Sequence, residues 1–279
     1  MQSRRSTWQT WHVRAEALRR VRALDGLAPE QVETVVQRLT KRVLERDSIR
    51  LTRDHDPVSE PAALTRADGQ SVYTVHGSAH YTSTDVLAAE QRIVAAGGLT
   101  RGRSIDAAHV DLALLESTAN GVTLNAGQSS LVREMATSSA CVQLAIAPAG
   151  AGKTTAMRAL STAWANGGGT VLGLAPSAAA AAVLGEQIDV ATDTLAKLVW
   201  SLHNDPDNLP EWAHAVDRNT LLVIDEAGMA DTLSLDAVVT FALERGAKVR
   251  LIGDDQQLAA IGAGGVLRDI EATHGARCD

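Results

Sequence analysis

The sequence predicts an α/β fold, in which helices cover a parallel β-sheet and a mainly helical region precedes it. Three observations support this prediction. From about residue 122 onward, short apolar runs are continuous rather than alternating, as in strands buried on both faces of a parallel sheet. Segments with helical spacing separate these runs, which is the layout of consecutive βαβ units. Aromatic residues make up only 3% of the 279 residues, so the core must consist mainly of Ala, Val, Leu and Ile.

The N-terminal region is predicted from apolar spacing and from helix start signals. Pro29 suits the first position of a helix, and Val and Leu recur after it at helical spacing. Thr82 and Asp85 resemble a capping box at the start of a later helix. In chain order we expect two amphipathic helices, a linker, a short strand and two further helices, at residues 6–24, 29–47, 50–70, 71–75, 82–96 and 106–117.

The second half of the chain is predicted to alternate strands and helices, with a domain boundary near Gly121. Residues 1–120 then form the helical N-terminal and linker region, and residues 121–279 form the α/β domain. The four expected strands are 141–147, 170–175, 221–224 and 249–252. The expected helices are 154–166, 177–187, 194–203 and 233–245.

Charge and cysteine content limit the possible partners and location. The formal net charge is −7, but the first 50 residues hold eleven Lys and Arg against six Asp and Glu. This basic segment favours a polyanion partner, and a solvated helix face is an equal alternative. Cys141 and Cys278 give neither a disulfide framework nor a metal spacing, so a cytoplasmic location is expected. The sequence contains no apolar run of about 18 residues, so no membrane-spanning helix is predicted.

The stretch A-P-A-G-A-G-K-T-T, residues 147–155, is predicted to bind a nucleotide phosphate. It follows an apolar run and precedes a helix, which is the context that a phosphate loop requires. Backbone N–H groups and the helix N-terminus would surround the phosphates. Lys153 would neutralise the β- and γ-phosphates, and the Thr154 hydroxyl would bind Mg²⁺. The predicted nucleotide-binding positions of the loop are Gly150, Ala151, Gly152, Lys153, Thr154 and Thr155.

Two further polar turns follow apolar runs and are predicted to complete the ATP site. Asp225 is expected to hold Mg²⁺ through its water shell, and Glu226 to orient or deprotonate the attacking water. An Asp at this place is also a common helix N-cap. In the next turn, Gln257 could sense the γ-phosphate and Asp254 could support the metal site, although an ordinary polar turn would carry the same residues.

Three stretches, A-P-A-G-A-G-K-T, I-D-E-A-G-M and G-D-D-Q-Q-L-A-A-I-G-A-G-G, resemble motifs I, II and III of superfamily 1 DNA helicases of the RecD-like branch. More narrowly, they are similar to the helicase part of conjugative relaxase–helicases of the TraI/TrwC (MobF) type. The resemblance covers roughly residues 122–270. It implies a RecA-like P-loop NTPase domain, the first motor domain of a helicase, which binds ATP and Mg²⁺. It also implies that Gln128 reads adenine and that Pro176, Ser177 and Thr194 contact single-stranded DNA.

The sequence departs from this family in two respects. Tyr73 and Tyr81 lie outside the expected relaxase position and His76 and His80 do not match its histidine cluster, so the chain is not expected to nick DNA. The stretch that resembles motif III lies close to the end of the chain. We therefore expect that the chain is truncated before the second motor domain of this family. The arginine that such a domain contributes is worth about 10³–10⁵ in rate. We therefore expect weak turnover and little or no unwinding.

DNA binding is expected to be weak because stacking aromatics are scarce. Trp164, Trp200, Trp212 and Phe241 fall in helical stretches and are predicted to serve packing rather than base stacking.

The preferred interpretation is thus an ATPase domain from a conjugative relaxase-like protein, with single-stranded DNA and other conjugation subunits as partners. The alternatives are a non-enzymatic nucleotide-binding module and, less well supported, an unrelated P-loop kinase.

Overall fold

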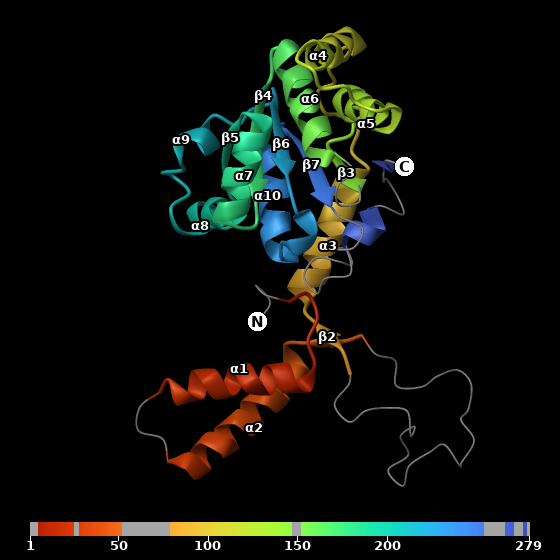
Figure 1. Cartoon of the computed structure of the whole chain (residues 1–279). Coiled ribbons are helices and arrows are strands. Elements are labelled where there is room, and N and C mark those ends of the chain that lie inside the picture. Colours follow the sequence, from red (N-terminus) through yellow and green to blue (C-terminus); the bar gives the residue numbers. More distant parts are fainter. Residues whose placement is uncertain are drawn as a thin grey trace, which may run out of the picture. The chain divides into compact units, whose positions relative to one another are not determined.

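The computed structural model describes residues 5–24, 28–51, 79–146, 152–253, 266–270 and 276–277 (Figure 1). The chain divides into two compact units, Met1–Ala88 and Ala89–Asp279. The strand expected at 71–75 lies outside the described residues, and the predicted domain boundary near Gly121 stays a prediction.

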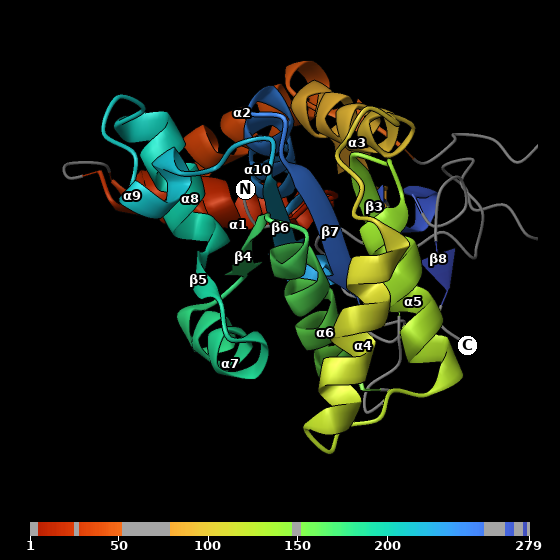
Figure 2. The same cartoon turned by 90° about the horizontal axis from the view of Figure 1, so that it is seen from above.

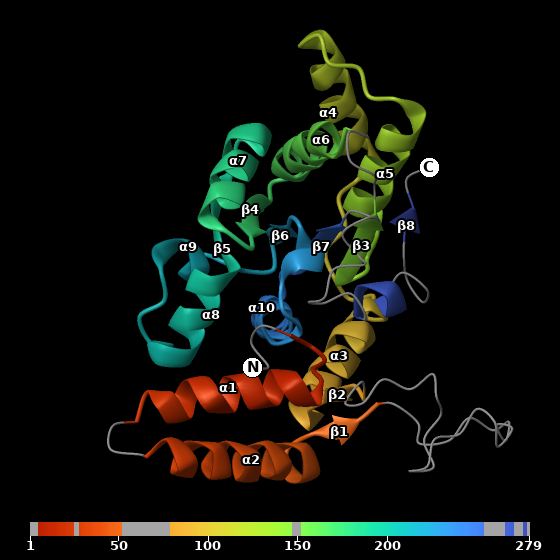
Figure 3. The same ribbon diagram turned by 60° about the horizontal axis from the view of Figure 1, so that its bottom comes forward.

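The first unit contains the two predicted amphipathic helices. Helices α1 (Thr10–Arg22) and α2 (Pro29–Arg46) lie side by side (Figure 3). Their contact buries Ala17 and Val21 of α1, which are four residues apart, and Val36 of α2, one of the apolar residues that recur at helical spacing after Pro29. Two short strands, β1 (Ile49–Arg50) and β2 (Tyr81–Thr82), pair in antiparallel fashion next to this helix pair.

The second unit confirms the predicted α/β fold. Its parallel sheet has the strand order β5-β4-β6-β7-β3-β8. The strands are β3 (Val142–Ile146), β4 (Thr170–Ala175), β5 (Ala191–Thr194), β6 (Thr220–Ile224), β7 (Lys248–Gly253) and β8 (Ala276–Arg277). The helices are α3 (Thr84–Gly97, whose start lies in the first unit), α4 (Ala107–Ala119), α5 (Ala126–Thr137), α6 (Lys153–Asn166), α7 (Ala178–Ile188), α8 (Leu195–Asn204), α9 (Glu211–His214), η3 (Ala227–Met229) and α10 (Thr232–Glu244), followed by a helical segment at 266–270.

Both faces of the sheet are covered, which explains why its strands are continuous apolar runs. Along β6, Leu222 and Ile224 pack into one core with α3, α8 and α10. Leu221 and Val223 point to the other face and pack with α4, α5, α6 and α7. Viewed from above, α4, α5 and α6 lie next to one another on that face (Figure 2).

Strand β7 places two basic side chains in the interior. Arg250 and Lys248 are both fully buried. The Arg250 guanidinium donates to the carbonyl oxygens of Met135 and Ala140, and Lys248 Nζ donates to the carbonyl oxygen of Ser138. These acceptors lie at or just after the C-terminal end of α5, where helix carbonyls otherwise lack partners. Hydrogen bonds from these two basic side chains therefore hold the C-terminal end of α5 against the sheet.

Several elements were not predicted from the sequence. Helix α5 was missed, although Asn125 caps it and Gln128 completes a capping box. The sequence stretch around Gln128 had been interpreted only as a nucleotide-binding motif. Strands β5 and β8 are short, and α9 is a single turn. Within the described segments, no helix is long and apolar enough to cross a membrane.

Candidate nucleotide-binding site

The register of the sheet aligns the carboxyl ends of the strands that precede the predicted motifs. Ile146 pairs with Gly253, Leu251 with Ile224, and Ile224 with Leu174. Because these strands are parallel, their carboxyl ends stand side by side. The carboxyl ends of β3, β4, β6 and β7 therefore lie at one edge of the sheet, which is where open α/β sheets bind ligands.

Helix α6 begins where the phosphate loop ends. Gly152 is its N-cap residue and has φ of +77°, a left-handed conformation that glycine adopts without strain. A Cβ atom at this position would lie 2.1 Å from Gln128 Nε2, so the Gln128 side chain lies directly against the Gly152 backbone. The structure thus brings together two residues that the sequence assigned to one ATP site. Gly150 and Ala151 lie outside the described residues.

Asp225 and Glu226 follow β6 at the same edge. The Asp225 backbone N–H donates to the Leu174 carbonyl at 2.9 Å, and its carboxylate accepts from the Glu226 N–H at 2.9 Å. Burial raises the pKa of Asp225, while the Glu226 N–H and the positive charge of Lys153 oppose that rise. Lys153 and Asp225, which belong to different motifs, are therefore close enough to interact electrostatically.

Glu226 has an unusual backbone conformation. Its φ of +50° lies in the left-handed region, which non-glycine residues seldom occupy. Such strain persists where the surrounding structure imposes it, and it concentrates at functional sites. Gln257 and Asp254, the predicted residues of the third motif, lie outside the described residues.

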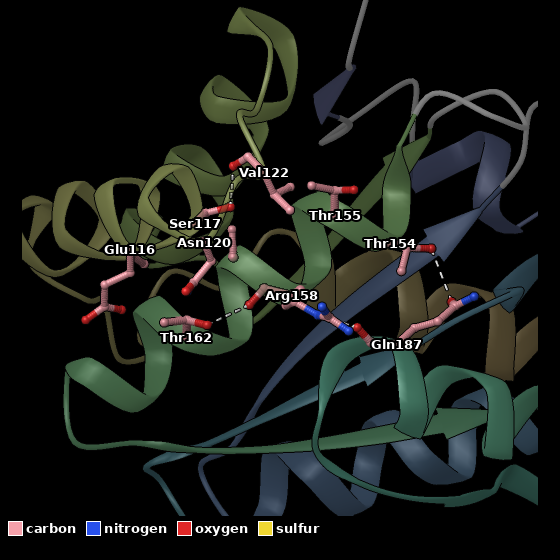
Figure 4. A pocket seen from close by; sticks show the side chains of 11 residues that line it. Glu116, Ser117, Asn120, Val122, Thr154, Thr155, Arg158, Thr162 and Gln187 are labelled. Atoms are coloured by element: carbon pink, nitrogen blue, oxygen red, sulfur yellow. Dashed lines mark hydrogen bonds between the residues drawn. The ribbon is translucent and has the colours of Figure 1, made fainter.

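A cavity of about 480 Å³ opens beside the first turns of α6 (Figure 4). Its volume falls in the range of about 300–1,000 Å³ typical of small-molecule sites. It lies between α6, the C-terminal half of α4 and the end of α7. The lining residues are Ala113, Glu116, Ser117, Asn120, Val122, Thr154, Thr155, Arg158, Ala159, Thr162 and Gln187.

The residues predicted to contact DNA lie at two other helix starts of this edge. Ser177 is exposed and caps α7 by accepting from the Ala180 N–H at 3.1 Å. Thr194 caps α8 by accepting from the Lys197 N–H at 3.2 Å. Pro176 is half-buried beside Ser177. Each hydroxyl uses a lone pair for its cap, so its proton is still available to donate to a phosphate oxygen.

The aromatic residues differ in exposure. Trp164 and Phe241 are buried, and Trp212 packs partly buried against the core. Trp200 is 61% exposed on α8, so it does not have the buried packing role of the other three.

Sequence reasoning missed two residues of the site region, Arg158 and Gln187. Gln187 belongs to the end of α7 and becomes a neighbour of α6 only through the packing of these two helices. The sequence around Gln187 carries no motif that would identify this residue as part of the site.

The described residues fit a magnesium nucleotide. The Thr154 hydroxyl and the Asp225 carboxylate supply oxygen donors, which Mg²⁺ prefers. Lys153 supplies a cation at the start of a helix whose N-terminus favours phosphate. When bound, the magnesium ion would neutralise charge on the phosphates.

Together, the parallel sheet, the helix beginning at Lys153 and the carboxylates at the same edge define a nucleotide-binding α/β domain of the P-loop class. The chain belongs to the family described as AAA domain, which matches residues 123–277, more than half of the chain. Membership implies nucleotide binding with a divalent metal ion.

Part of the chain is also similar to bacterial conjugal transfer proteins. A probable conjugal transfer protein TraA of Sinorhizobium fredii is 38% identical over 125 residues, which are 45% of this chain and 11% of that protein. Conjugal transfer protein TraA of Rhizobium radiobacter is 37% identical over 124 residues, 44% of this chain and 10% of that protein. The TraA protein of Agrobacterium fabrum is 36% identical over 124 residues, with the same coverage. The matched segment thus spans about a tenth of these relatives.

Proposed function

We propose that this chain is an ATP-binding, Mg²⁺-dependent motor domain of a DNA helicase from a conjugative relaxase–helicase of the TraI/TrwC (MobF) type. The observation that carries the proposal is that Lys153 begins α6 and Asp225 follows β6 at the same edge of the sheet, where the positive charge of Lys153 acts on the Asp225 carboxylate. The similarity to conjugal transfer proteins supports the conjugative context. Other subunits of a conjugation apparatus would be its protein partners.

The proposed roles follow from the chemistry of each group. Lys153 neutralises the terminal phosphates, and Thr154 and Asp225 hold the magnesium ion. Glu226 orients or deprotonates the attacking water, and Gln257 senses the γ-phosphate. The backbone of Gly150, Ala151 and Gly152, together with Thr155, surrounds the phosphates, and Gln128 reads adenine.

Single-stranded DNA is the proposed polymer partner. Pro176, Ser177 and Thr194 lie at the N-terminal ends of α7 and α8, where backbone N–H groups and hydroxyls favour phosphate oxygens. The 279 residues carry one set of motor-domain motifs. We therefore propose that the chain alone hydrolyses ATP slowly and responds weakly to DNA.

The first test is nucleotide binding by the Lys153→Ala variant. Removing a charge-assisted hydrogen bond costs about 1.5–3 kcal/mol, which corresponds to a roughly 10- to 100-fold loss of affinity for a fluorescent ATP analogue. Lys41→Ala is the matched control, because Lys41 is an exposed lysine on α2 paired with Glu45 at 3.8 Å. Equal affinities of the two variants would refute the proposal.

A second measurement separates the ATPase from a non-enzymatic nucleotide-binding module. Glu226→Gln should keep nucleotide affinity and abolish phosphate release. If the wild-type chain binds ATP but releases no phosphate above the level of Glu226→Gln, the non-enzymatic alternative is correct.

A further inference from the structure

Gln187 contacts the residue that is proposed to bind the metal ion. The Thr154 hydroxyl donates to Gln187 Oε1 at 3.2 Å, and both side chains line the cavity beside α6 (Figure 4). Among the described residues this amide is the only hydrogen-bond partner of the hydroxyl, and Asp225 is not one. At 3.2 Å the bond is longer than most hydroxyl hydrogen bonds, so it fixes a direction without binding tightly.

The backbone of Gln187 is fixed relative to α6. Arg158 Nε donates to the Gln187 carbonyl at 2.6 Å, and Arg158 Nη2 donates to the Glu186 carbonyl at 3.4 Å. On either side of Gln187 along α7, Leu184 and Ile188 are buried in the core that contains α6. These contacts hold the end of α7 against α6, the helix that carries Thr154. The backbone position from which the Gln187 side chain extends is therefore fixed.

A threonine hydroxyl has one proton and two lone pairs. If the proton points to an acceptor, the lone pairs point elsewhere and can bind a cation. A hydroxyl without such an acceptor can turn its proton toward the metal position, which opposes binding. Groups that orient a metal ligand in this way typically change metal affinity about 10- to 100-fold when they are removed.

We propose that Gln187 is a positioning residue for the metal-binding hydroxyl: it accepts the Thr154 proton and so leaves an oxygen lone pair for the divalent cation of a bound nucleotide. This inference rests on the proposed function, because it requires a magnesium nucleotide at this site.

The test compares the affinity for a fluorescent ADP analogue in Mg²⁺ with the affinity in EDTA. The ratio of the two affinities isolates the contribution of the metal ion. Gln187→Leu removes the acceptor and should lower the ratio about 10-fold, with unchanged affinity in EDTA. Gln187→Glu keeps an acceptor oxygen and should keep the ratio. Glu186→Leu is the matched control, because it makes a similar apolar change at the adjacent, exposed residue.

A double variant shows whether Gln187 acts through Thr154. In a Thr154→Val background, Gln187→Leu should cause no further loss of the ratio, because the hydroxyl that it orients is gone. Urea denaturation of each variant verifies that the fold is intact.

The possible failures are distinguishable. A wild-type chain that binds no nucleotide refutes the proposed function, and the role of Gln187 falls with it. If the wild type responds to Mg²⁺ and Gln187→Leu keeps the full ratio, or loses affinity equally in Mg²⁺ and EDTA, the positioning role alone is refuted.

Discussion

Lys248 should make the stability of the α/β unit depend on pH in the neutral to alkaline range. Its side chain is fully buried at the start of β7, with Nζ 5.8 Å from the centre of the Trp164 ring. Burial and, to a smaller extent, the neighbouring charge of Arg250 lower the pKa of Lys248 to about 7, while Cys141 opposes the shift. The informative perturbation is Lys248→Met, which keeps an unbranched chain and removes the ionisable group.

The magnitude follows from the difference between the folded and unfolded pKa values of Lys248, about 7 against the ordinary 10.5. Between these values the unfolded chain binds a proton that the folded chain does not, so stability rises with pH. Below pH 7 Lys248 is protonated in both the folded and the unfolded chain, so the free energy of unfolding is lowered by the full cost of burying its charge. Each pH unit well inside the window is worth about 1.4 kcal/mol. Raising the pH from 7 to 9 should therefore stabilise the wild type by about 2 kcal/mol relative to the variant.

Urea denaturation of both chains at pH 7, 8 and 9 measures this difference directly. Groups that titrate in both chains cancel in the comparison. Burial lowers the pKa of Arg250 only to about 10, so Arg250 stays charged over most of this range. If the unfolding free energies of the wild type and Lys248→Met change in parallel with pH, then Lys248 is protonated in the folded chain and the reasoning is wrong.

Three other substitutions test individual contacts. Gly152→Ala forces a Cβ into a left-handed position and against Gln128, so it should cost about 1–2 kcal/mol in urea denaturation and weaken nucleotide binding; unchanged stability would contradict the φ of +77°. Asp236→Ala removes the bidentate partner of Arg92, whose bonds measure 3.0 and 2.6 Å, and should cost about 1–3 kcal/mol, whereas no loss would mean that the pair is fully screened. Trp200→Ala should change the unfolding free energy by less than about 0.5 kcal/mol, because the ring is 61% exposed; a larger loss in urea would reveal packing that its exposure does not indicate.

The fold was predictable because both faces of the sheet are covered. A strand buried on both faces is usually a continuous apolar run, so the strands at 170–175 and 221–224 could be predicted without knowing their partners. The same rule missed the edge strand β5 (Ala191–Thr194), because three of its four residues are polar and none is buried. It also gave no warning that Lys248 and Arg250 would be buried within β7, because their partners are carbonyl groups of a distant loop and helix end.

The site was predictable as far as local motifs extend. Lys153 and Asp225 each follow an apolar strand, and the parallel sheet alone is enough to bring their segments to one edge. Gln187 was not predictable, because no local pattern marks it and its contact with Thr154 depends on how α7 packs on α6. Motifs therefore predicted the groups that we propose to touch the nucleotide, whereas Gln187, which we propose to orient one of them, became evident only in the tertiary structure.

Helix α7 connects the proposed nucleotide site to a proposed DNA contact. Its first turn is capped by Ser177, a residue proposed to contact DNA, and near its other end Gln187 meets the hydroxyl of Thr154. A helix is stiff along its axis, and α7 is anchored to α6 by Arg158 and by the buried Leu184. A shift of α6 on nucleotide binding would therefore be transmitted to the helix end that bears Ser177. If both ligands bind as proposed, linkage requires that DNA change nucleotide affinity by the same factor by which nucleotide changes DNA affinity.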